Sequence, residues 1–153
     1  MEAVLLGWPP DEPTLRLDYR RFSYAGKFVM TNTGKAILQK PTATGRAKKS
    51  KFDEDVLAAV AFNADRTDSE TLWLRYVTVR LDRRGEGLGP KLCRFLADRA
   101  FNRGYDHLQI AVNNPFAYEA LYRAGFAYTG GRTGIAELIL ERPSNREASD
   151  RSK

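Results

Sequence analysis

The chain has 153 residues, of which 42% are hydrophobic and 29% charged, and this fits one globular domain with a core of its own. It has no apolar run long enough for a membrane span, and residues 1–8 lack the basic and apolar regions of a secretory signal, so we expect a cytoplasmic protein without a membrane partner. A single cysteine, Cys93, excludes an internal disulfide, and its apolar neighbours predict a small buried side chain. With His107 the only histidine, we expect no metal site.

The net charge of +6 is concentrated in one short stretch, because residues 40–51 carry five basic and no acidic residues. The high isoelectric point therefore does not require a basic face over the whole fold. The stretch contains Pro41 and Gly45 and no apolar periodicity, so we expect a flexible basic loop. Two interpretations stay open for it, a solvated insertion and a contact with an acidic partner.

The first third of the chain gives weak structural signals. Residues 1–14 are rich in proline and acidic residues and are expected to form an irregular lead-in. Residues 15–24 alternate only in part, which fits either a strand or a short helix. Residues 27–30 and 36–38 are mostly apolar and flank Thr31-Asn32-Thr33-Gly34, so we expect a β-hairpin there.

The central part gives stronger signals. Residues 56–62 and 72–79 are rich in β-branched and aromatic residues and predict two strands. Apolar residues at helical spacing predict a helix over residues 91–103, with Gly104 as its stop. Residues 107–112 predict another strand.

The last third continues the alternation of helix and strand. Asn114 and Pro115 predict the start of a short helix that ends before Gly125. Two closing strands are expected over residues 126–128 and 135–140. We expect one domain over residues 1–142 and a disordered tail over 143–153. The order of elements predicts the α/β class, in the form of an α+β mixed sheet with helices packed on it.

The stretch Arg84-Gly85-Glu86-Gly87-Leu88-Gly89-Pro90 connects a predicted strand to a predicted helix. Its three alternating glycines leave backbone N–H groups unshielded at the positive end of a helix dipole, which favours binding of a phosphate or pyrophosphate. A P-loop is excluded because Pro90 and Lys91 follow Gly89 where Lys and Ser/Thr are needed. The dinucleotide fingerprint also fails, because Pro90 or Leu92 stands where its third glycine belongs.

Two blocks carry a resemblance to a known family. Arg84-x-x-Gly87-x-Gly89 after a strand resembles the acetyl-CoA motif of the GNAT N-acetyltransferase superfamily, and Asn114 to Phe126 resembles its later Asn-x-x-Ala…Gly-Phe segment. The resemblance covers residues 73–126 and implies a GNAT-like acyl-CoA N-acyltransferase fold with a mostly antiparallel central sheet flanked by helices. Such folds usually have two helices after the first strand, and residues 15–40 do not predict them.

The resemblance also implies a cosubstrate and its contacts. Acetyl-CoA would be bound through its pantetheine arm by the backbone of Val77, Thr78 and Val79 and, from the other side, by Asn114. Its pyrophosphate would be held by the backbone of Arg84, Gly85, Glu86, Gly87, Leu88, Gly89 and Pro90. The implied reaction is transfer of an acetyl group to a primary amine of a small molecule or protein, by direct attack on the thioester.

The catalytic groups are less well specified. A tyrosine in the second block is the family's common proton donor to the departing thiolate, and Tyr122 is the first candidate. Anchoring on Asn114 and Gly125, however, puts Leu121 at the usual position, about 100° from Tyr122 around a helix. Tyr118 is the secondary candidate, since it lies four residues before Tyr122 on the same face.

No general base can be assigned, because residues 72–79 contain no carboxylate and a chain of waters could take the proton. The alternative function is a non-catalytic module that binds acyl-CoA, or a polyanion such as RNA through residues 40–51. Neither the acceptor nor the oligomeric state follows from the sequence.

Overall fold

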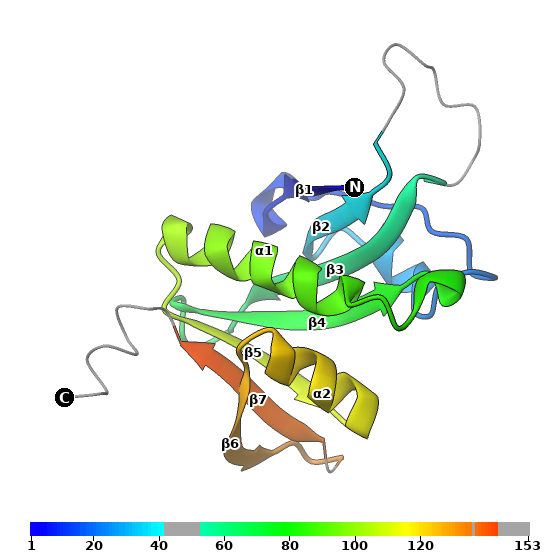
Figure 1. The fold of residues 1–153 in the computed structure, drawn as a ribbon. Helices are drawn as coiled ribbons and strands as arrows, with labels where there is room; N and C mark the ends of the chain where they lie inside the picture. The colour runs from blue at the N-terminus through cyan, green and yellow to red at the C-terminus, as the bar shows by residue number, and fades with distance from the viewer. Residues whose placement is uncertain (42–52, 136, 144–153) are drawn as a thin grey trace.

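The computed structural model describes residues 1–41, 53–135 and 137–143, and these form a seven-stranded sheet in the order β1-β2-β3-β4-β5-β7-β6 (Figure 1). Neighbouring strands are antiparallel except β4 and β5, which are parallel. The strands are β1 (Glu2–Gly7), β2 (Gly34–Gln39), β3 (Val56–Ala64), β4 (Thr71–Val79), β5 (His107–Val112), β6 (Ala127–Arg132) and β7 (Leu138–Pro143). The predicted class, a mixed and mostly antiparallel sheet flanked by helices, is confirmed.

Two α-helices pack on one face of this sheet, called here the helical face (Figure 1). They are α1 (Leu88–Arg103), which follows β4, and α2 (Pro115–Arg123), which follows β5. Because β4 and β5 are parallel, the two helices that follow them begin at the same edge of the sheet. The predicted stop of α1 is confirmed: Gly104 has a φ of 111° and its N–H donates to the carbonyls of Ala100 and Phe101.

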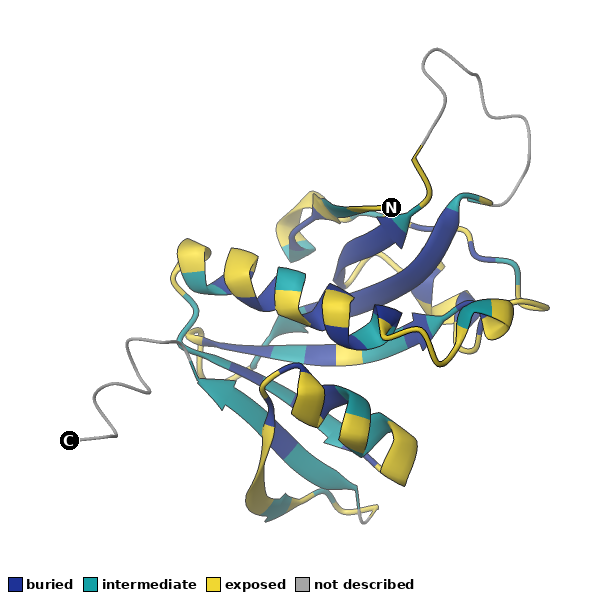
Figure 2. Cartoon of the chain, in the orientation of Figure 1, coloured by how far each residue is buried: buried dark blue, intermediate teal, exposed yellow. Residues whose placement is uncertain are grey.

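The main core lies between α1 and the sheet. Leu92 and Leu96 of α1 are fully buried in one cluster with Phe62 of β3. Trp8 joins this cluster, and its ring centroid lies 5.5 Å from that of Phe62. Strands β2 and β3 are accordingly buried along most of their length, whereas β7 is mostly half-buried (Figure 2). The helical face therefore supplies most of the apolar burial that stabilises the fold.

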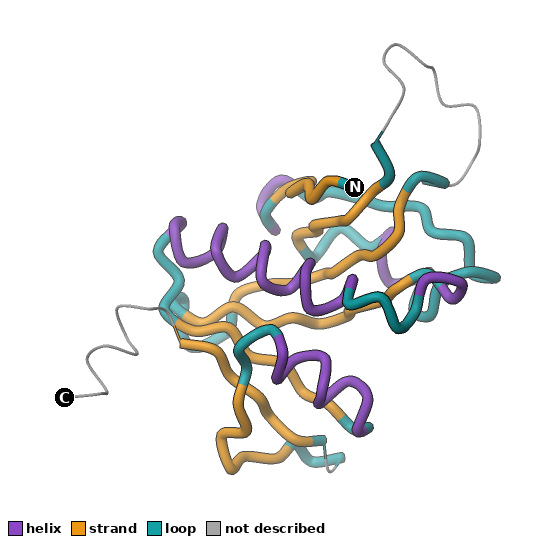
Figure 3. The backbone as a smooth tube through the Cα atoms, viewed as in Figure 1, coloured by secondary structure: helices purple, strands orange, loops and turns teal. Residues whose placement is uncertain are grey.

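A smaller core covers the opposite face of the sheet. Residues 12–33 cross it as loops with one short 3-10 helix, η2 (Ala25–Val29), and no α-helix (Figure 3). Leu15, Leu17 and Phe28 of this segment are buried against Ile37 of β2. The region 15–24 is thus neither a strand nor a helix, although its apolar residues are buried. The other 3-10 helices of the described chain are η1 (Pro9–Asp11) and η3 (Leu81–Arg83).

The expected hairpin over residues 27–38 is wrong. Its first half is the 3-10 helix η2, and only its second half is a strand, β2. The physical reason is the buried ammonium group of Lys35, which donates to the carbonyl of Met30 at 2.6 Å and to the carbonyl and hydroxyl of Thr33, both at 2.9 Å. These bonds hold residues 30–33 close to the start of β2 as a compact turn. A paired strand there would have its carbonyls in the sheet.

The expected irregular lead-in is also wrong at its start, since residues 2–7 form β1 and pair antiparallel with β2. The continuous apolar run from Ala3 to Leu6 gives no alternation to detect, and pairing with a distant strand decides its conformation. Most of the expected basic loop 40–51 and the tail after Pro143 lie outside the described residues. In the described part no helix is long and apolar enough to cross a membrane.

Candidate active site

Strands β4 and β5 diverge soon after they meet. They pair only where residues 71–73 of β4 lie beside residues 107–109 of β5. Beyond this point the β4 backbone groups that point away from β3 have no strand beside them. We call this region, between residues 74–79 of β4 and 110–112 of β5, the fork. It leaves backbone donors and acceptors of β4 available to a ligand.

A β-bulge in β4 shapes one side of the fork. Leu74 lies opposite Phe62 and Tyr76 lies opposite Ala61, so Arg75 is an extra residue in β4. The bulge switches the side chains between faces: Val77 and Val79 pack on the helical-face core, and Tyr76 packs on the opposite face. The predicted cofactor residues 77–79 therefore lie on the free half of β4.

The glycine turn lies at the end of β4 and opens α1. Gly85 and Gly87 have φ values of 85° and 77°, a conformation that favours glycine, and a Cβ on either would meet no atom within 4 Å. Gly87 is the N-cap of α1, and no side chain caps this end of the helix. Open space therefore adjoins Gly85 and Gly87 at the positive end of α1. Pro90 has no N–H and is buried, so it cannot donate as the pattern suggested.

The second helix begins at the other side of the fork. Asn114 caps α2, as predicted, because its Oδ1 accepts from the N–H of Ala117 at 2.8 Å. Beside it lies a cavity of about 400 Å³, lined by Val112, Asn113, Asn114, Pro115, Tyr118 and Leu138. Both helix N-termini and this cavity therefore lie at the edge of the sheet where β4 and β5 end.

The structure separates the two candidate tyrosines. Tyr118 is half-buried and lines the cavity, whereas the side chain of Tyr122 lies on the surface with 66% exposure. Leu121, which the sequence spacing predicted at the position of the family's tyrosine, is 4% exposed and belongs to the helical-face core. Only the secondary candidate is thus placed beside the fork.

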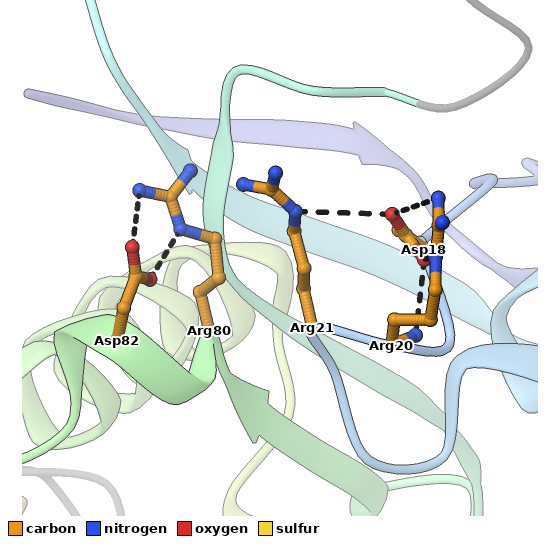
Figure 4. Close-up of polar contacts among 5 residues, drawn as sticks. All are labelled: Asp18, Arg20, Arg21, Arg80 and Asp82. Carbon is orange, nitrogen blue, oxygen red and sulfur yellow. Dashed lines mark hydrogen bonds and ion pairs between the residues drawn. The ribbon is translucent and has the colours of Figure 1, made fainter.

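A backbone hydrogen bond joins residues 18–21 to the end of β4, and each of these two segments carries its own local ion pair. Arg80 makes a bidentate pair with Asp82 at 2.7 and 3.2 Å, and Arg20 makes one with Asp18 at 3.0 Å for both contacts (Figure 4). Hydrogen bonds from these guanidinium groups hold the pKa of Asp82 and of Asp18 below the usual range. Between the pairs, the N–H of Leu81 donates to the carbonyl of Arg21 at 2.9 Å. Residues 18–21 are therefore held beside the strand that borders the fork.

Sequence reasoning missed the side chains that approach β4 from the opposite face. The ring of Tyr24 lies 5.5 Å from the ring of Tyr76, and the ammonium of Lys27 lies 5.7 Å from the same ring. Arg84 was predicted for its backbone, but its side chain donates to the hydroxyl of Ser23 at 3.2 Å. No sequence signal could have paired these residues, because the bulge and the path of residues 12–33 bring them together.

The single cysteine lies in the core. Cys93 is fully buried in the core, and burial raises the pKa of its thiol to about 12. The prediction of a small buried side chain is confirmed. Among the residues with described positions, no three His, Cys, Asp or Glu side chains are grouped to hold a metal ion.

The comparisons with known proteins agree with this geometry. The model of the acetyltransferase (GNAT) family matches residues 9–126, which is well over half of the chain. The chain therefore belongs to the acetyltransferase (GNAT) family, as its two sequence blocks suggested. No curated protein matches the sequence at a significant level.

Solved structures show the same fold at low identity. Nourseothricin acetyltransferase is 21% identical with a TM-score of 0.56, over 72% of this chain and 65% of that chain. Ribosomal-protein-alanine N-acetyltransferase from Brucella melitensis is 15% identical with a TM-score of 0.57, over 73% of this chain and 69% of that chain. The yncA protein from Salmonella typhimurium, solved with its cofactor acetyl-CoA, is 16% identical with a TM-score of 0.56, over 72% and 64%. The chain thus spans about two thirds of the length of these proteins.

Proposed function

We propose that the protein is an acetyl-CoA-dependent N-acetyltransferase that acetylates a primary amine by direct attack on the thioester. The observation that carries the proposal is the fork, where an unpaired half-strand meets two helix N-termini and a cavity. Membership of the acetyltransferase (GNAT) family supports it. A cytoplasmic location is part of the same proposal.

Each part of the fork has a role in binding acetyl-CoA. The N–H groups of Arg84, Gly85, Glu86, Gly87, Leu88 and Gly89 would hold the pyrophosphate, because they lie at the start of α1, where open space adjoins Gly85 and Gly87. The free backbone of Val77, Thr78 and Val79 would pair with the amide groups of the pantetheine arm, as a neighbouring strand would. Asn114 would contact the arm from the α2 side, although its Oδ1 is already engaged as a cap.

The chemical step needs an oxyanion stabiliser and a proton donor. The neutral amine nitrogen attacks the carbonyl carbon, a C–N bond forms, and the C–S bond breaks to release coenzyme A as a thiolate. Backbone N–H groups near Val79 would stabilise the charge on the carbonyl oxygen. Tyr118 would protonate the thiolate, since it lines the cavity while Tyr122 is exposed. The proton of the amine would leave to water, because residues 74–79 contain no carboxylate.

Thermal unfolding with acetyl-CoA tests the first half of this proposal. At one hundred times its dissociation constant a ligand stabilises the folded state by about 2.7 kcal/mol, which is readily measured. ATP serves as the control, because a nonspecific phosphate site would respond to both ligands. Equal responses to ATP and acetyl-CoA, or none, would contradict the proposal.

Release of coenzyme A in the presence of a panel of amines tests the second half. We expect acetylated amine and free thiol in equal amounts. Thiol release without acetylated product would mean hydrolysis and not transfer. The alternative of a polyanion-binding module rests on residues 40–51, most of which lie outside the described chain, and nothing in the described part supports it.

A further inference from the structure

The opposite face of the fork carries a cluster of aromatic and basic side chains. Tyr76 of β4 packs on this face with the ring of Tyr24, at 5.5 Å and an angle of 43°. The ammonium of Lys27 lies over the Tyr76 ring at 5.7 Å. Thr78, two residues further along β4, is 3% exposed, and its hydroxyl has no hydrogen-bond partner among the described residues. The free half of β4 thus directs the side chains of Tyr76 and Thr78 to this face, where the Thr78 hydroxyl is buried.

Arg84 joins the same cluster from the glycine turn. Its guanidinium donates to the hydroxyl of Ser23 at 3.2 Å, and Ser23 directly precedes Tyr24. The side chain of Arg84 is therefore directed to the segment that carries Tyr24 and Lys27. Two cations from distant parts of the sequence are in this way connected to one pair of tyrosines.

Charge pairing distinguishes Lys27 and Arg84 from the basic residues around them. Arg20, Arg80 and Arg83 each contact a carboxylate, at 3.0, 2.7 and 3.1 Å. Lys27 and Arg84 contact no carboxylate in the part of the chain that the structure describes, and both are exposed. This face of the fork therefore has two cations whose charge is free to act on a ligand.

The acceptor amine would reach the thioester from this face. On the helical face, Val77 and Val79 are packed against the core under α1. On the opposite face Tyr76 is half-buried and Thr78 is buried, so an amine that attacks a thioester held along residues 77–79 would enter beside the exposed side chains of Tyr24 and Lys27. The two unpaired cations lie along that approach.

We infer, resting on the proposed function, that the acceptor is an amine that also bears an anionic group, which Lys27 and Arg84 bind. Carboxylate and phosphate share this chemistry. Cationic polyamines are disfavoured, because like charges at short range repel. The same cations lower the pKa of a bound ammonium group, which favours its neutral, reactive form at a site that has no assigned base.

Matched acceptors test the inference through kcat/KM for acetyl transfer. Each pair differs only in the anion: an amino acid against its amide, and phosphoethanolamine against ethanolamine, with spermidine as the cationic probe. We expect the anionic member of at least one pair to react ten-fold faster or more, and spermidine to be a poor substrate. The pair that shows the preference tells carboxylate from phosphate.

Lys27→Met tests the assigned cation. The variant should raise KM for the preferred anionic acceptor about ten-fold and leave KM for its neutral partner unchanged, so that the preference is lost. Arg99→Met is the matched control, because Arg99 is also an exposed cation over an aromatic ring, 4.9 Å from Phe95 on α1, and lies outside the fork. It should keep the preference.

The outcomes separate this inference from the proposed function. A preference for neutral amines or spermidine, or an anion preference that survives in Lys27→Met, would overturn the inference while the acetyltransferase assignment stands. Failure of acetyl-CoA to raise the melting temperature, or transfer to no amine in the panel, would overturn the proposed function itself.

Discussion

The N–H of Tyr118 donates to the carbonyl of Asn114 at 3.1 Å, so the two side chains lie one turn apart on the part of α2 that lines the cavity. Tyr122, the next residue at the same spacing, lies on the surface near the end of this nine-residue helix. Helix α2 thus places the side chains of Asn114 and Tyr118 beside the fork.

Replacement of Tyr118 by Phe should lower kcat for acetyl transfer by about ten- to a hundred-fold, since a positioned proton donor contributes roughly 10²–10⁴ and water can replace part of it. The ring is kept, so the thermal response to acetyl-CoA should be unchanged. Tyr122→Phe is the matched control on the same helix and should retain its activity. A larger loss in Tyr122→Phe than in Tyr118→Phe, measured by thiol release, would reverse the assignment.

The glycine turn can be tested with a matched pair of glycines at the two ends of α1. Gly87 and Gly104 both have positive φ, at 77° and 111°, and a Cβ on either would meet open space. Alanine at each position should cost about 1–2 kcal/mol of folding free energy through backbone strain. Only Gly87→Ala should also weaken acetyl-CoA binding, because its methyl group enters the space assigned to the pyrophosphate. Equal affinities by calorimetry would place the anion elsewhere.

The buried ammonium of Lys35 should be a major determinant of the first third of the fold. Lys35→Met removes the donor to Met30 and Thr33 and leaves their buried oxygens unsatisfied, which should cost about 1–3 kcal/mol in urea unfolding. Lys27→Met, at an exposed position, should change stability by less than about 0.5 kcal/mol. If the two variants were equally stable, the hydrogen bonds from Lys35 to residues 30–33 would contribute nothing measurable to the free energy of unfolding.

The second half of the fold was predictable because its signals are local. Asn114 and Gly104 mark helix ends through their own backbone geometry, and residues 56–62 and 72–79 are strands by composition. The spacing of Asn114 and Gly125 also set Leu121 apart from Tyr122, and the two differ in burial, with 4% and 66% exposure.

The first half of the fold was not predictable, because its signals are not local. Its structure depends on contacts between distant residues, such as β1 with β2 and Arg84 with Ser23, which are 61 residues apart. The bulge at Arg75 is equally invisible in the sequence, yet it decides that Tyr76 packs on the face opposite the helices. The glycine turn and the start of α2 are therefore encoded locally, whereas the contacts on the face opposite the helices emerge only in the folded chain.

Stability at low pH should depend on Asp65 at the end of β3. Its carboxylate accepts from the backbone N–H groups of Thr67 and Asp68 and from the indole N–H of Trp73, and these bonds lower its pKa from 3.8 to about 2. The unfolded chain binds this proton more tightly, so the stabilisation is complete above pH 3.8 and is lost as the pH falls through 2. The urea midpoint of the wild type should fall over this range more steeply than that of Asp65→Asn, which cannot titrate. Parallel curves for the two proteins would show that Asp65 is not a source of acid sensitivity.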